Sequence, residues 1–138
     1  MVTKINTRVF LGGTCNGSTW RDDMIKMLTI DYFNPVVENW TEACMDQEIW
    51  EREHCDVVLY TITPKMTGVY SIAEVVDDSN KQPGKTVLIL LQKDIDKVFD
   101  KGQWRSLKAV AQMVERNGGA IFYSLKEAAL AINQRRVI

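Results

Sequence analysis

Apolar and polar positions alternate along this chain in blocks that predict strands and helices in turn. Short apolar runs, each ended by glycine, proline or a polar loop, predict five strands, at residues 7–11, 31–34, 56–62, 86–91 and 120–123. Stretches with apolar residues at helical spacing predict five helices, at residues 19–28, 41–53, 68–79, 104–117 and 125–134. Thr19 and Asp22 resemble a capping box at the start of the first helix.

The alternation of strands and helices predicts a single α/β domain over residues 1–138. We expect a flavodoxin-like three-layer sandwich whose five-stranded parallel sheet has the order 2-1-3-4-5. In that order, the loops after the first and third strands meet at the switch point of the sheet, where ligands bind. These loops are residues 12–18 and 63–67. The strand order therefore predicts a ligand cleft between them.

Composition and charge narrow the class of protein. The 138 residues are 46% apolar and 25% charged, with a net charge of −1. They predict a soluble globular protein that does not bind a nucleic-acid polymer. The longest apolar run, at residues 87–91, is too short to cross a membrane, and no apolar signal segment precedes the first strand. We expect a cytoplasmic location. No histidine and cysteine cluster has metal-ligand spacing, so we expect no metal and no cofactor.

The first loop, GGTCNGS at residues 12–18, lies between a predicted strand and a predicted helix. Its backbone N–H groups are suited to an anion, although a flexible turn fits the same residues equally well. Arg21 follows in the first turn of the helix. A cation at that position opposes the helix dipole, which favours a binding role for Arg21.

The predicted third helix carries a carboxylate, Glu74, at a position of interest. Its apolar residues form one stripe, and the polar residues on the opposite side are Ser71, Glu74 and Asp78. A solvated face, with Ser71 and Glu74 as a capping box, is one interpretation of this pattern. A functional carboxylate is the other, because the predicted strand order places the start of this helix beside the cleft.

Four segments in order resemble the nucleoside 2-deoxyribosyltransferase-like family over roughly the first two-thirds of the chain. They are VFLGGTCNGSTWR, YFNPVVENW, CDVVLYTITPKMTGVYSIAEV and GKTVLIL, of which GVYSIAE with GKTV is the most specific. The resemblance implies the same fold and a glutamate nucleophile that attacks the anomeric carbon of a nucleoside sugar. Glu74 matches that glutamate. It also implies an aspartate, matched by Asp56, that opens the third strand and positions or protonates the base.

The resemblance further implies a set of substrate-binding residues. The first loop would hold the sugar or a 5′-phosphate, and the end of the second strand would line the base site; with neighbours at the predicted cleft, the set is Gly12, Gly13, Thr14, Asn16, Ser18, Arg21, Asn34, Tyr70 and Ser71. Classical members begin Tyr-Leu-Ala-Gly-Pro, whereas this chain has Phe-Leu-Gly-Gly-Thr at residues 10–14. Tyr60 or Tyr70 would then stand in for the missing tyrosine. Classical transferases also complete the site from a neighbouring subunit, which implies a homodimer or a larger homo-oligomer.

The resulting prediction is an enzyme that cleaves or transfers the N-glycosidic bond of (deoxy)nucleosides or nucleoside 5′-monophosphates through a glutamyl-sugar intermediate. Transfer follows if a second base accepts the sugar, and hydrolysis if water does. Arg21 slightly favours a 5′-phosphate, and like charge near Glu74 would raise the pKa of a buried Asp56 so that it protonates the base. A catalytically inactive nucleotide-binding protein of the same fold, acting as a sensor or sponge, is the alternative.

Overall fold

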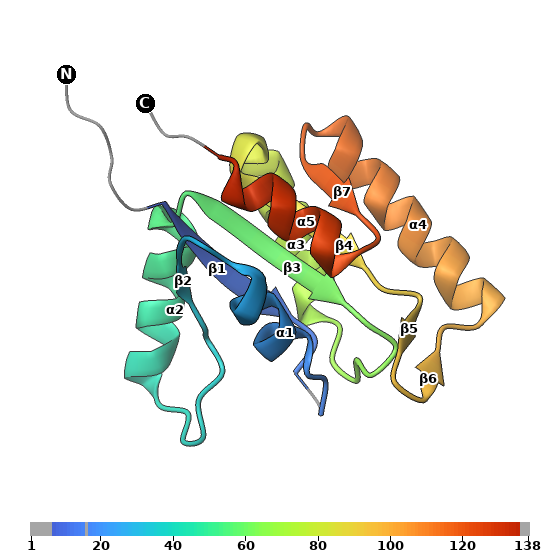
Figure 1. The fold of residues 1–138 in the computed structure, drawn as a ribbon, viewed down its shortest axis with the longest axis horizontal. Helices are drawn as coiled ribbons and strands as arrows, with labels where there is room; N and C mark the ends of the chain where they lie inside the picture. Colours follow the sequence, from blue (N-terminus) through green and yellow to red (C-terminus); the bar gives the residue numbers. More distant parts are fainter. Residues whose placement is uncertain (1–6, 16, 136–138) are drawn as a thin grey trace.

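The central sheet has the predicted strand order. The computed structural model describes residues 7–15 and 17–135. Its five-stranded parallel sheet has the order β2-β1-β3-β4-β7 (Figure 1), formed by β1 (Arg8–Gly13), β2 (Asp31–Phe33), β3 (Val57–Ile62), β4 (Thr86–Leu90) and β7 (Ala120–Phe122). The predicted order 2-1-3-4-5 and the flavodoxin-like architecture are confirmed.

Helices cover both faces of the sheet, in three layers. They are α1 (Trp20–Met27), α2 (Glu42–His54), α3 (Tyr70–Lys81), α4 (Lys101–Arg116) and α5 (Leu125–Asn133). α1 packs with α5 on one face, and α3 packs with α4 on the other (Figure 1). β3 and β4 are buried along their whole lengths, as their continuous apolar sequences predict for central parallel strands.

Helix starts differ from the predicted ones in a way that capping explains. α4 begins at Lys101, three residues before the predicted start, because Asp100 forms a capping box with Gln103. Asp100 Oδ1 accepts from Gln103 N at 2.8 Å, and Gln103 Oε1 accepts from Asp100 N at 3.1 Å. Within the described part of the chain, no side chain caps α1 or α3. The capping boxes expected for Thr19 with Asp22, and for Ser71 with Glu74, are therefore wrong.

Two short elements were not predicted. Residues 93–98 form an antiparallel hairpin of β5 (Lys93–Asp94) and β6 (Lys97–Val98), and η1 (Pro83–Lys85) is a single 3₁₀ turn before β4. The hairpin is tied to the first loop, since the Ser18 hydroxyl donates to Asp94 Oδ2 at 2.6 Å. Of the helices in the described ranges, none is both long and apolar enough to cross a membrane.

Candidate active site

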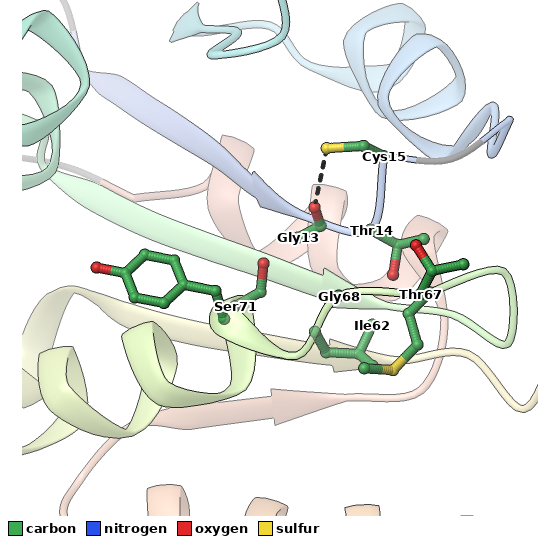
Figure 2. Close-up of a pocket in the computed structure, with 9 residues that line it drawn as sticks. Gly13, Thr14, Cys15, Ile62, Thr67, Gly68 and Ser71 are labelled. Atoms are coloured by element: carbon green, nitrogen blue, oxygen red, sulfur yellow. Dashed lines mark hydrogen bonds between the residues drawn. The ribbon is translucent and has the colours of Figure 1, made fainter. Parts of the chain in front are cut away.

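A cleft lies at the carboxyl ends of β1 and β3, between the two loops that the strand order brings together. It has a volume of about 290 Å³, and its lining consists of Gly13, Thr14, Cys15, Ile62, Met66, Thr67, Gly68, Tyr70 and Ser71. Figure 2 shows the first loop on one side of this cleft and the segment that leads into α3 on the other, with the Ser71 hydroxyl directed toward Gly13. Five predicted binding residues thus border or enter the cleft: Gly13, Thr14, Tyr70 and Ser71 line it, and Gly12 directly precedes it.

Two glycines let the end of β1 lie close against β3. Gly12 pairs with Tyr60 in the sheet, and a Cβ on Gly12 would lie 2.7 Å from carbons of the Tyr60 ring. Gly13 has a φ of 121°, and a Cβ there would collide with the backbone of Thr61. Both glycines are therefore required by the packing of the two strands, whatever binds in the cleft.

The polar atoms of the first loop are largely engaged within the protein. Thr14 is buried: its N–H donates to Thr61 O at 2.9 Å, and its hydroxyl oxygen accepts from Thr63 N at 3.0 Å. The hydroxyl of Ser18 is committed to Asp94. Asn16 lies outside the described residues. The loop thus offers a ligand fewer free donors than its sequence predicts.

Arg21 braces the end of β1 instead of facing the cleft. It is buried, and its guanidinium donates to the carbonyls of Leu11 (Nε, 3.0 Å), Thr14 (Nη1, 2.6 Å) and Gly13 (Nη2, 3.1 Å). These contacts contradict the expectation that Arg21 supplies a free charge for a phosphate. The carbonyls that end β1 have no further strand partner there, and Arg21 satisfies them.

Asp56 lies at the wrong end of β3 for the role predicted for it. It precedes β3, and its Oδ2 accepts from Arg8 N at 2.9 Å. The cleft is at the carboxyl end of the same strand, about 20 Å away for six extended residues. A residue that opens a parallel strand cannot reach the loops at the other end of the strands, so the placement of Asp56 beside Glu74 is wrong.

Glu74 lies one helical turn beyond Ser71, outside the set of residues that line the cleft, and is buried beside Arg52 of α2. Its side chain is 9% exposed, and its Oε2 is 3.5 Å from Arg52 Nη1. The interpretation of this helix side as a solvated face is wrong, because Glu74 and Asp78 are both buried there. Burial raises the pKa of Glu74 to about 7; the positive charge of Arg52 opposes this rise, and the carboxylates of Glu48 and Asp78 add to it.

Arg52, on α2, joins a group of side chains from three elements. Its Nε donates to both Tyr60 Oη, at 3.0 Å, and Asp78 Oδ2, at 3.4 Å. Its Nη2 donates to Asp78 Oδ1 at 3.1 Å, and the Tyr60 hydroxyl donates to Asp78 Oδ2 at 2.5 Å. Tyr60, proposed from sequence as a substitute for the missing first-strand tyrosine, thus contacts Arg52 and Asp78.

Glu48 is the second carboxylate of the site, and sequence reasoning missed it. It lies one turn before Arg52 on α2 and is half-buried. Burial raises the pKa of Glu48, and the charges of Arg52 and Arg21 lower it. Its own charge raises the pKa of Glu74, so the two carboxylates interact. The four-residue spacing of Glu48 and Arg52 indicates that both lie on one side of a helix. Only the packing of α2 against α3 shows that this side faces Glu74.

Asn34 follows β2, and its side-chain oxygen accepts from Val36 N at 3.1 Å, so it shapes the loop that leads to α2. Tyr70 is largely exposed at the mouth of the cleft. Within the described ranges, no group of three or more histidine, cysteine, aspartate or glutamate side chains is arranged to hold a metal ion.

Comparison with protein-family models gives a match that covers most of the chain. Residues 6–95, more than half of the 138, match a family model described as "Nucleoside 2-deoxyribosyltransferase like". The matched range contains both cleft loops and the carboxylates Glu48 and Glu74, whereas α4, β7 and α5 follow it. A search of curated proteins finds no match to the chain.

Proposed function

The chain belongs to the nucleoside 2-deoxyribosyltransferase-like family, and we propose that it cleaves or transfers the N-glycosidic bond of nucleosides or nucleoside 5′-monophosphates. The observation that carries this proposal is the buried carboxylate of Glu74, one turn below the cleft rim, with its pKa raised to about 7. A carboxylate that is poised near neutral pH one helical turn from a cleft at the switch point is suited to covalent catalysis.

Glu74 acts as the nucleophile in the proposed reaction. Its carboxylate attacks the anomeric carbon of the sugar, the bond from that carbon to the base nitrogen breaks, and a glycosyl ester of Glu74 forms. The transition state resembles an oxocarbenium ion, and a nearby carboxylate stabilises its positive charge. A second base then accepts the sugar in transfer, or water accepts it in hydrolysis, and Glu74 is released in either case.

Glu48 replaces Asp56 as the proposed proton donor to the departing base. Its raised pKa and its interaction with Glu74 support this role. Two interacting carboxylates lose their protons at different pH, and the larger rise in pKa belongs to Glu74. The resting proton is therefore on Glu74, and the proposed division requires that it moves to Glu48 when the substrate binds. This division supplies one acid and one nucleophile, as in retaining glycosidases.

The surroundings of the first loop favour a nucleoside over a 5′-monophosphate. Arg21 is turned toward backbone carbonyls, and the carboxylate of Asp94 beside Ser18 would repel a phosphate. Lys65, whose ammonium donates to Gly17 O at 3.3 Å, is a second cation tied to this loop and is the candidate for any phosphate contact.

A panel experiment tests the proposal. The purified protein is incubated with ribo- and deoxynucleosides and with their 5′-monophosphates, each with and without a second free base, and the released bases and new nucleosides are separated by chromatography. Base release without acceptor supports hydrolysis, and a new nucleoside supports transfer. Tight binding without any release would instead support the inactive nucleotide-binding protein.

A further inference from the structure

Arg52 is joined to Tyr60 and Asp78 by hydrogen bonds and also lies beside Glu74, the proposed nucleophile. Three elements contribute to this group: Arg52 comes from α2, Tyr60 from β3, and both Glu74 and Asp78 from α3. We propose that Arg52 is a positioning residue for the reaction, anchored by Asp78 and Tyr60, and that it keeps the carboxylate of Glu74 charged and directed at the cleft. This inference rests on the proposed role of Glu74 as the nucleophile.

The anchor holds the guanidinium from the side away from Glu74. Asp78 accepts from Arg52 Nη2 at 3.1 Å, and Tyr60 accepts from Arg52 Nε at 3.0 Å. The two anchors are bonded to each other at 2.5 Å, and Gln82 Nε2 donates to Asp78 Oδ1 at 3.1 Å and to the carbonyl of Arg52 at 3.0 Å. The planar guanidinium is therefore fixed through two of its three nitrogens.

The third nitrogen of Arg52 faces Glu74 at a longer distance. Nη1 is 3.5 Å from Glu74 Oε2, compared with 3.1 Å and 3.0 Å for the anchoring bonds. At that separation the positive charge still stabilises the carboxylate, but it does not occupy the lone pairs as a short hydrogen bond would. A nucleophile needs this combination, because its oxygen must be charged and yet free to attack carbon.

Tyr60 is itself held by the end of β1. Gly12 faces the Tyr60 ring so closely that a Cβ would lie 2.7 Å from it. The phenol ring also lies tilted against the ring of Phe10, with ring centroids 6.1 Å apart. The first strand thus fixes Tyr60, Tyr60 and Asp78 fix Arg52, and Arg52 acts on Glu74.

The charged groups that act on Glu74 come from two helices. α2 contributes Arg52 and Glu48, and α3 contributes Asp78. Burial, Glu48 and Asp78 all favour the neutral acid, whereas Arg52 alone among these favours the carboxylate. Arg21 of α1 acts only on Glu48 within this group. Removal of the Arg52 charge is therefore expected to leave Glu74 protonated at neutral pH.

The experiment titrates Glu74 directly by carboxyl-carbon NMR on protein with labelled glutamate, and Glu74→Gln identifies its signal. We expect Arg52→Met to raise the pKa of Glu74 by at least about one pH unit. Arg52→Lys restores a charge without the anchored geometry. We therefore expect the pKa of Glu74 in this variant to lie between its values in Arg52→Met and in the wild type. An unchanged pKa in both variants would overturn the proposal.

Two further variants separate the anchor from the charge. Tyr60→Phe removes an uncharged hydroxyl, so it can raise the pKa of Glu74 only by loosening Arg52; a rise smaller than that of Arg52→Met supports the anchor, and no rise refutes it. Asp77→Asn is the matched control, since Asp77 is 47% exposed and 3.9 Å from Arg52 Nη2. We expect that Asp77→Asn does not raise the pKa of Glu74.

The titration needs no substrate, so its result is independent of the proposed reaction. If the wild type releases no base while the variants shift Glu74 as expected, the proposed function fails and the influence of Arg52 on Glu74 stands. If the wild type is active, the acidic limb of its kcat/KM profile moves to higher pH in Arg52→Met and partly returns in Arg52→Lys. An unmoved limb in an active Arg52→Met enzyme would contradict the positioning role.

Discussion

The hydroxyl of Tyr60 donates to Asp78 at 2.5 Å, and this bond links the centre of β3 to a helix turn beyond Glu74. Both side chains also accept from Arg52 of α2, whose guanidinium lies beside the buried carboxylate of Glu74. Burial of that carboxylate has a consequence for stability that can be measured without substrate.

Stability is expected to fall as pH rises from about 4.5 to 7. The pKa of Glu74 is about 7 in the folded protein and 4.5 without the fold, so the folded state holds a proton that the unfolded state has lost. At pH 8 this difference in pKa lowers the free energy of unfolding by about 3 kcal/mol. Glu74→Gln removes this cost, so it should be more stable than the wild type at pH 8 and equal to it near pH 4.5. Urea unfolding of both proteins at these two pH values measures the difference; an equal difference at both pH values would contradict it.

Arg21 is expected to matter for stability and not for the choice of substrate. Arg21→Ala removes the guanidinium donor from three carbonyls at the end of β1. Thr14 O still accepts from Trp20 Nε1, and Gly13 O from the Cys15 thiol. We expect a loss of about 2–4 kcal/mol in the free energy of unfolding. The ratio of affinities for a nucleoside and its 5′-monophosphate, measured by calorimetry in the Glu74→Gln background, should not change.

Lys65→Ala is the matched comparison for that titration. The Lys65 side chain lies over the first loop without a role in the sheet. If monophosphates bind, Lys65→Ala should weaken them and leave nucleosides unaffected. A change of the ratio in Arg21→Ala and not in Lys65→Ala would restore the phosphate-binding role that the sequence predicts for Arg21.

Gly12→Ala should disturb the packing of β1 on β3. The added Cβ would meet the Tyr60 ring at 2.7 Å, and the sheet leaves little room for either residue to move. We expect a loss of about 1–3 kcal/mol in stability, the range for overpacking. Gly84→Ala serves as the control, since a Cβ there meets no atom within 4 Å. Thermal unfolding that is equal in both variants would show that Tyr60 is not held in this way.

An exposed apolar surface on and before α2 predicts self-association. Trp40 is 59% exposed and Trp50 is 54% exposed, with Met45 and Ile49 on the same helix as Trp50. Aromatic and methionine side chains are enriched in interfaces. Sedimentation should show a species of at least twice 15.8 kDa, and Trp50→Arg should shift it toward the monomer. A monomer at micromolar concentration in the wild type would refute the prediction.

The sequence was sufficient for the sheet and insufficient for the contacts around Glu74. Continuous apolar runs at β3 and β4 identify central parallel strands, and the strand order then places the cleft. The hairpin at residues 93–98 was missed because its strands are two residues long and carry only one apolar residue, Val98. Residues of such short strands show no alternation that could be recognised.

The partners of Glu74 depend on which helices pack together. Glu48 and Arg52 belong to a helix whose exposed and buried sides are not separated clearly by its sequence. Their roles follow only once α2 is seen to cover the polar side of α3. The role predicted for Asp56 is wrong for a different reason, because Asp56 precedes β3 whereas the cleft lies beyond the other end of that strand. A sequence match gives the order of residues along the chain, whereas a site requires residues at the same end of the strands.

The most direct test of the account is whether a sugar becomes attached to Glu74. The wild type and Glu74→Gln are incubated with a 2′-fluorinated nucleoside, whose fluorine slows release of a glycosyl intermediate, and intact mass and peptide mapping follow. Asp77→Asn, an exposed carboxylate change on the same helix, is the control. We predict one added sugar on the peptide that contains Glu74 in the wild type and control, none in Glu74→Gln, and a loss of several orders of magnitude in base release for that variant. Near-normal base release by Glu74→Gln, or a sugar attached at another residue, would contradict the account.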